Sequence, residues 1–260
     1  MNRSVAVALI LIVAGIIAFV VLRSGSNIEP PALRVDAPPA APPRTETPPE
    51  PPVVEVPAEP AAVTVEEPPV PAPESLEGSD LLVPVALEKL SPPLLQWVVP
   101  DEQVRKLVLA VDLLAAGKLP QRHKPIAYDM AAFAVVGAKD DFQAADKNLD
   151  RLTPLVNAAI EIDPKTLGRY YQAWLPVMES AYAELGKKGT FKQRVQDVIK
   201  RIQQVGPAPE NAVLVRPNVL YQYADPALEN RSALEKWLWR MGDENREKIQ
   251  NYLREISFYL

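Results

Sequence analysis

The sequence contains no cysteine and only one histidine. The missing cysteines exclude disulfides, thiolate metal sites, iron–sulfur ligation, thiol nucleophiles and the lipid anchor of a lipoprotein. His123 lies between basic residues in Gln121-Arg122-His123-Lys124, with no second histidine to complete a zinc site, and these cations disfavour a role in a Ser-His-Asp triad. We interpret His123 as a solvated loop residue and expect no metal and no cofactor.

Patterns that bind phosphate or zinc are also missing. The sequence lacks G-x-G-x-x-G, G-x-x-x-x-G-K-[ST] and H-E-x-x-H, so nucleotide chemistry has no support. Residues 79–260 carry 24 Lys or Arg against 23 Asp or Glu, and this balance disfavours bulk nucleic-acid binding. The net charge of -5 comes from residues 24–78, which hold ten acidic residues and two arginines.

A long apolar run lies near the N-terminus. Residues 5–22 read VAVALILIVAGIIAFVVL, eighteen apolar residues without a charge, and an α-helix of that length spans about 27 Å. Arg3 and Arg23 flank the run, so the positive-inside rule favours a cytoplasmic N-terminus only weakly. A cleaved signal peptide is the alternative, but the run exceeds the usual apolar core of about 7–15 residues. We predict an inner-membrane anchor in residues 1–23, with the rest of the chain in the periplasm.

Proline dominates the next segment. Sixteen of the 29 prolines lie between Glu29 and Pro73, many in pairs. Proline removes backbone donors and favours polyproline II, and at about 3.1 Å per residue such a segment reaches on the order of 140 Å. We predict that residues 24–78 form an acidic, disordered spacer. The alternative is that the prolines bind an aromatic groove on a partner.

Residues 79–260 show helical periodicity and predict an all-α, bundle-like domain. Ser79 and Asp80 are expected to cap a first helix running toward Leu90. Asp163-Pro164 and Thr190 are start patterns for two later helices, and Gly117 and Gly186 are stop patterns. The other predicted helices cover residues 101–116, 142–160, 164–185, 191–205, 232–241 and 244–260.

Two segments do not fit this helical pattern. We expect residues 118–141 to be irregular, because their apolar patch at residues 131–136 could form a strand, a helical turn or a packed loop. Val213–Val215 and the residues Val219, Tyr221 and Tyr223 alternate with period two. The domain is therefore expected to contain at most one short hairpin.

Four strings carry a resemblance to a known family: residues 102–105 (EQVR) leading to Val111-Asp112, residues 181–186 (AYAELG), Phe191-x-x-Arg194, and residues 240–245 (RMGDEN). Over roughly residues 80–258 the sequence resembles the bacterial family called domain of unknown function 3014. The resemblance implies a mostly helical, envelope-facing domain of Gram-negative bacteria with an anchor and a proline-rich linker, and it implies no reaction. Leu113 and Leu152 depart from the family pattern, which has Asn and an aromatic residue there.

Glu179-Ser180 is the best enzymatic candidate. The pair is similar to the single general acid of soluble lytic transglycosylases, which cleave peptidoglycan. However, the glycine-rich, glutamine-bearing motif of those enzymes does not follow, since residues 181–186 read AYAELG. We therefore favour a helix-surface role for Glu179.

One helix region gathers charge of a single sign. The cations are Lys187, Lys188, Lys192, Arg194, Lys200 and Arg201, with Asp197 alone opposing them. They could contact anionic lipid or an acidic partner, but a solvated helix face is the more common explanation. Five aromatic residues could similarly line a groove or pack in the core: Tyr170, Tyr171, Trp174, Trp237 and Trp239. We expect one tryptophan of each pair to be buried.

Taken together, these patterns favour a non-enzymatic interaction or scaffold module of the cell envelope. Its partners would be the inner membrane, through residues 5–22, and an unidentified envelope protein or cell-wall component. One alternative is a peptidoglycan hydrolase or lyase using Glu179. Another is an envelope-spanning coupling protein of the TonB type, against which the charge-free apolar run and the helical C-terminal domain argue.

Overall fold

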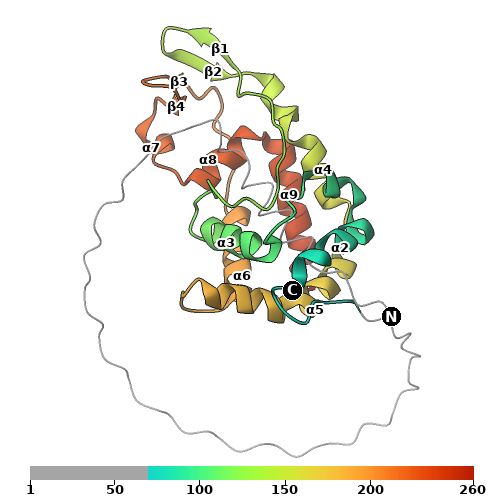
Figure 1. The fold of residues 1–260 in the computed structure, drawn as a ribbon. Helices are drawn as coiled ribbons and strands as arrows, with labels where there is room; N and C mark the ends of the chain where they lie inside the picture. Colours follow the sequence, from blue (N-terminus) through green and yellow to red (C-terminus); the bar gives the residue numbers. More distant parts are fainter. Residues whose placement is uncertain (1–69) are drawn as a thin grey trace, which may run out of the picture. The chain divides into compact units, whose positions relative to one another are not determined.

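The computed structural model describes residues 70–260, in which helices surround a shared core and one small antiparallel sheet lies at one end (Figure 1). The helical elements are η2 (Ser79–Leu81), α2 (Val83–Leu90), η3 (Pro92–Trp97), α3 (Gln103–Ala115), η4 (Asp146–Arg151), α4 (Thr153–Ile160), α5 (Pro164–Glu184), α6 (Phe191–Gln203), α7 (Pro226–Glu229), α8 (Ala233–Arg240) and α9 (Asp243–Ile256). The strands are β1 (Val135–Ala138), β2 (Asp141–Ala144), β3 (Leu214–Val215) and β4 (Gln222–Tyr223).

Several helix termini lie where the sequence predicts them. Asp163 Oδ2 accepts a hydrogen bond from Thr166 N at 2.7 Å and caps α5. Thr190 and Gln193 form a reciprocal capping box at the start of α6. Gly117 follows α3 with φ of 74°, a left-handed conformation that suits glycine at a helix C-terminus. Local sequence therefore fixes the ends of these helices.

Asp80 caps a helix other than the one predicted. Its carboxylate accepts from Glu102 N at 2.7 Å and from Gln103 N at 2.8 Å, at the start of α3. Glu102 adopts a left-handed φ of 51° and makes no side-chain cap itself. The expected cap of the first helix is thus corrected: α2 begins without a side-chain cap, and Asp80 joins the N-terminal end of the domain to α3.

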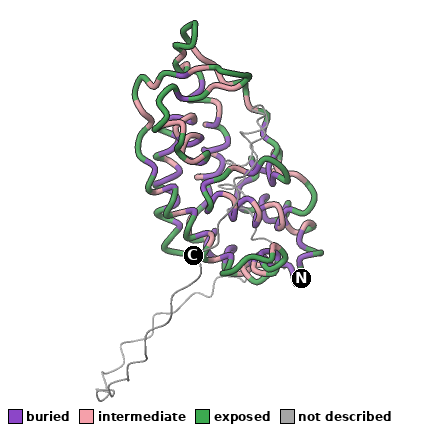
Figure 2. Tube along the Cα trace, turned by 90° about the vertical axis from the view of Figure 1, so that its left-hand side faces the viewer, coloured by how far each residue is buried: buried purple, intermediate pink, exposed green. Residues whose placement is uncertain are grey.

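The core is built around α3. This helix packs against α5 and α6, while α9 packs against α4 and α5. The predicted apolar stripe of α3 is buried, as is that of α6, and the buried positions lie along the inner sides of the helices in Figure 2. Amphipathic periodicity therefore identified which faces of these helices meet.

The all-α prediction needs correction, because four strands form one sheet in the order β1-β2-β3-β4. The predicted hairpin is present as β3 and β4, which pair Leu214 with Tyr223. A second hairpin, β1 and β2, pairs Val135 with Ala144 and joins the first where Phe142 faces Leu214. The helix expected from residue 142 is therefore a strand as far as Ala144.

A tight turn explains this error. Lys139 and Asp140, which connect β1 to β2, have φ values of 55° and 62°. Two consecutive residues with positive φ are the backbone requirement of a type I′ hairpin turn, which usually contains Asn-Gly or Asp-Gly. Here Lys-Asp occupies the turn, so the composition gives no indication of a hairpin.

Residues 70–78 pack against the helices, and we name them the N-terminal strap. Trp174 Nε1 on α5 donates to Pro71 O at 2.9 Å, Leu76 is buried, and Val70 and Ala72 lie against the core. The last residues of the proline-rich segment thus pack against the helices, upstream of the boundary expected at residue 79. Pro71 accepts a hydrogen bond and Pro73 is buried, although neither proline can donate from its backbone.

The predicted anchor at residues 5–22 and the spacer up to residue 69 lie outside the described residues. Within residues 70–260, none of the helices combines the length and apolarity that crossing a bilayer requires.

Candidate functional site

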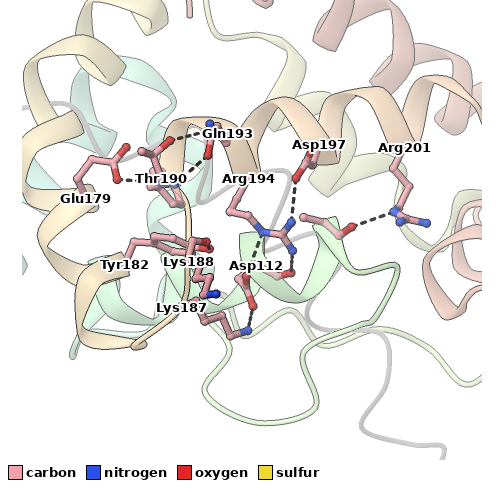
Figure 3. A network of polar contacts seen from close by, with 12 residues as sticks. Asp112, Glu179, Tyr182, Lys187, Lys188, Thr190, Gln193, Arg194, Asp197 and Arg201 are labelled. Carbon is pink, nitrogen blue, oxygen red and sulfur yellow. Dashed lines mark hydrogen bonds and ion pairs between the residues drawn. The ribbon is translucent and has the colours of Figure 1, made fainter. Parts of the chain in front are cut away.

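The predicted basic residues form a structural network centred on a buried acid (Figure 3). Asp112 on α3 is 2% exposed, and its carboxylate binds Lys187 Nζ and, at 3.0 Å, Arg194 Nε. Arg194 also donates to the backbone oxygen of Asp112 at 3.1 Å and pairs with Asp197 at 2.8 Å. The network therefore joins α3, α6 and the loop between α5 and α6.

Other members of the predicted basic face divide into two groups. Arg201 Nε donates to Ala115 O at 3.0 Å, so it caps the C-terminal end of α3. Lys188, Lys192 and Lys200 make no ion pair with any carboxylate in residues 70–260. Half of the predicted contact residues thus bond within the fold, and these three lysines are left without an ion-pair partner in residues 70–260.

Glu179 has a structural role in this network. Its two carboxylate oxygens accept from Phe191 N at 2.7 Å and from Lys192 N at 3.0 Å. These amides belong to the first turn of α6, where unpaired N–H groups and the helix dipole favour a negative charge. Glu179 therefore caps α6 from α5, and Thr190 caps the same helix locally.

The aromatic candidates also lie mostly in the core. Tyr170, Tyr171, Trp174 and Trp237 are buried, whereas Trp239 is partly exposed. Burial raises the pKa of the Tyr171 hydroxyl well above its usual range, so this tyrosine is neutral. His123 is exposed in a loop, and residues 70–260 contain no group of acidic or histidine side chains arranged to hold a metal ion.

A second cluster of side chains was not predicted. Arg151 and Arg240 both stack on the ring of Phe133, with guanidinium carbons 5.5 Å and 5.6 Å from its centroid. Arg240 also lies 5.8 Å from the Tyr223 ring, and Arg216 lies 5.4 Å from the Tyr221 ring. We call this group the arginine–aromatic cluster; its members are Phe133, Phe142, Arg151, Arg216, Tyr221, Tyr223, Trp239 and Arg240.

Ring contacts extend the cluster across the sheet. Tyr221 lies edge-on to Phe142, with centroids 5.3 Å apart and planes at 76°. Tyr223 and Trp239 make a similar contact at 5.9 Å and 89°. Such edge-to-face pairs add about 0.5–1.5 kcal/mol beyond the burial of apolar area. Both hairpins and α8 therefore contribute rings to the cluster, and Arg240 connects its two groups of rings by contacting Phe133 and Tyr223.

The string RMGDEN at residues 240–245 brings the two arginines together. Gly242 has φ of 88°, a conformation that residues with a side chain rarely adopt, and the Leu149 side chain of η4 packs against it. Asn245 then donates to Leu149 O at 2.8 Å and to Thr153 Oγ1 at 3.0 Å. These contacts hold η4, which ends at Arg151, against the turn that follows Arg240.

Asn148 positions the ring that both arginines share. Its side chain donates to Ala134 O at 2.6 Å and accepts from Ala134 N at 2.9 Å, as a neighbouring strand would. Arg151 Nη1 donates to the same Asn148 oxygen at 3.1 Å. Phe133 and Arg151 are thus fixed by one buried amide, which sequence periodicity could not reveal.

The charges of the cluster are not balanced by the chain. Arg151 and Arg240 make no ion pair with a carboxylate of residues 70–260. Burial and, next, the nearby charge of Arg240 lower the pKa of the Arg151 guanidinium. Burial raises the pKa of Tyr223, and the charge of Arg240 opposes this effect. The arginines therefore lie close enough to repel each other.

Comparison with known proteins identifies the family. The family model described as "Protein of unknown function (DUF3014)" matches residues 103–257, and the chain belongs to this family. No curated protein and no solved structure matches the chain. The matched range contains the sheet, Arg151 and Arg240, whereas the N-terminal strap and α2 lie upstream of it.

Replacement of Asp112 by Asn should destabilise the domain. The change leaves Lys187 and Arg194 without their shared counter-charge at a buried position. We expect a loss of about 1–3 kcal/mol, less than for a fully buried pair because Lys187 reaches solvent. Urea unfolding measured by circular dichroism checks this value. Asp197→Asn is the control, since an exposed pair contributes at most about 1 kcal/mol; equal losses in both variants would contradict the central role of Asp112.

Replacement of Glu179 by Ala should lower stability without removing an activity. The loss of two hydrogen bonds at the start of α6 is expected to reduce the free energy of unfolding by about 1–2 kcal/mol. Ser180→Ala, at the exposed neighbouring position, should have little effect. Digestion of purified peptidoglycan is the second measurement: release of soluble fragments by the natural chain but not by Glu179→Ala would establish catalysis and overturn the structural interpretation.

Proposed function

We propose that the chain is a membrane-anchored interaction module of the bacterial envelope. In this proposal, residues 5–22 hold it in the inner membrane, residues 24–69 space the domain from the bilayer, and the domain in the periplasm binds a partner by contact. The arginine–aromatic cluster is the observation that carries the proposal, because it places uncompensated cations among partly exposed rings. Arginine, tyrosine and tryptophan are the residues that most often dominate protein–protein interfaces.

Exposed apolar side chains near the cluster support the same face. Val136 on β1 is 55% exposed, Val213 beside β3 is 38% exposed, and Val219 between β3 and β4 is 72% exposed. The sheet protrudes at the end of the domain remote from α5 (Figures 1 and 2). A face that combines apolar positions with unpaired arginines fits an acidic partner that also presents apolar surface. We define the contact face as β1–β4 together with the arginine–aromatic cluster.

The rival functions receive less support. A peptidoglycan hydrolase or lyase would need Glu179 to reach a substrate, but both of its carboxylate oxygens accept backbone hydrogen bonds from the first turn of α6. The lipid-facing role of the basic residues is also weakened, since Lys187, Arg194 and Arg201 bond within the fold. A coupling protein of the TonB type has no specific observation in its favour.

Crosslinking in living cells tests the contact face. A photoreactive amino acid at position 219 or 136 should yield a discrete adduct of higher mass, because these side chains are exposed at the contact face. The matched control is position 81 on η2, which is apolar and 82% exposed but packs beside α2 and α3. Adducts of equal yield from position 81, or none from the sheet, would refute this face as the partner site.

The membrane address has a separate test. Alkaline phosphatase fused after Leu260 should be active, since this enzyme folds only where disulfides form. The same fusion without residues 1–23 should be inactive, because the domain would then remain in the cytoplasm. An inactive full-length fusion would reverse the topology, and release of the mature chain without its apolar run would replace the anchor by a cleaved signal peptide.

A further inference from the structure

Most other half-buried cations of the domain have a carboxylate partner. Arg194 pairs with Asp112 at 3.0 Å, Lys236 with Glu229 at 2.6 Å, and Arg246 with Asp243 at 2.9 Å. Arg151 and Arg240 are exceptions in this respect, and they share one ring. A buried charge without a counter-charge is unfavourable, and a second like charge nearby increases the penalty. The cluster is therefore electrostatically incomplete when considered alone.

Hydrogen bonding at the two arginines is incomplete as well. Both Nε atoms are buried and have no acceptor among the described residues. Arg151 donates from Nη1 to Asn148 Oδ1 at 3.1 Å and from Nη2 to the sulfur of Met130, a weak acceptor. Arg240 makes a long bond of 3.3 Å from Nη2 to Tyr221 O and a side-chain hydrogen bond to Tyr223. Each guanidinium carries five N–H donors and stacking on Phe133 engages only its face, so in-plane donors remain beyond these bonds. These donors match the oxygens of a carboxylate or phosphate.

We propose that Arg151 and Arg240 form a binding site for an oxyanion group, a carboxylate or a phosphate, carried by the partner. The inference rests on the proposed function and deepens it by naming the chemistry recognised at the contact face. The oxyanion supplies the missing negative charge and accepts from guanidinium donors that the chain leaves unused. The aromatic rings of Phe133 and Tyr223 hold both guanidiniums in place before the ligand arrives, which limits the loss of side-chain entropy on binding.

Thermal unfolding of the full chain in detergent micelles tests this site with simple probes. Inorganic phosphate, at constant ionic strength set with sodium chloride, should raise the unfolding temperature, because a ligand that binds only the folded state stabilises it. Arg151→Met and Arg240→Met should each abolish this increase. Arg254→Met on the exposed face of α9 is the control and should retain it. Since phosphate also stabilises proteins through general exclusion from their surface, the difference between variants is the decisive quantity.

A double-mutant cycle gives a second readout that does not depend on the stability of any single variant. Without phosphate, Arg151 and Arg240 repel each other, so the double variant should lose more stability than the two single variants combined. With phosphate bound to both guanidiniums, the coupling should reverse sign. A coupling that is unchanged by phosphate, or equal stabilisation of all variants, would identify an adventitious ion only and overturn the proposal.

Acetate in place of phosphate distinguishes the two sources of the oxyanion. Stabilisation by both probes that depends on Arg151 and Arg240 supports a site for which a carboxylate suffices, whereas stabilisation by phosphate alone assigns a phosphate group. Failure of both probes, while crosslinks from position 219 persist, would remove the oxyanion site and leave the contact face intact. The loss of those crosslinks would instead refute the proposed function.

Discussion

The contact between η4 and the turn that joins α8 to α9 is the one on which the arginine–aromatic cluster depends. In this turn Gly242 has φ of 88°, which other residues rarely adopt, and the Leu149 side chain of η4 packs against it. A shift of η4 away from this turn would separate Arg151 from Arg240, because one ends η4 and the other ends α8. Asn245 reinforces the contact from the first turn of α9 through its bonds to Leu149 O and Thr153 Oγ1. The turn at Gly242 and the Asn245 side chain thus hold two cations in one environment that electrostatics alone would disfavour.

The two polar clusters differ in how their charges are neutralised. Around Asp112, a buried acid is surrounded by Lys187 and Arg194 from outside α3, so the network is internally complete and joins three parts of the fold. Around Phe133, the arginines meet rings and amides that stabilise cations only weakly, at about 0.5–2 kcal/mol for each ring contact. The first arrangement is typical of structural ion pairs. The arginine–aromatic cluster instead retains unused hydrogen-bond donors at a partly exposed position. Functional sites often keep such unsatisfied groups at the expense of stability.

The sequence predicted those features that depend on local chemistry. Asp163, Thr190 and Gly117 mark helix ends because capping uses neighbouring residues, and the stripes of α3 and α6 follow from helical periodicity. Only one of the two hairpins was predicted. The β1–β2 hairpin was missed because its turn, Lys139-Asp140, relies on positive φ values that these residues rarely adopt. Glu179 and Asp80 cap helices that begin 12 and 23 residues away, and four α-helices separate Arg151 from Arg240 along the chain. Such long-range contacts leave no periodic pattern in a single sequence.

The way the chain joins the domain bears on how a partner would reach the contact face. The first residues of the N-terminal strap contact α5, where Trp174 donates a hydrogen bond to Pro71 O. Near the other end of the strap, Glu77 lies 3.7 Å from Arg105 on α3. These contacts attach the strap to helices at the end of the domain remote from the sheet (Figure 1). A pull or a restraint transmitted through residues 70–78 would therefore act on α3 and α5, which are joined to α6 by the Asp112 and Glu179 contacts. Because ion pairs and hydrogen bonds join those helices to one another, the strap is attached to a well-connected part of the fold, and its contacts leave β1–β4 and the two unpaired arginines uncovered.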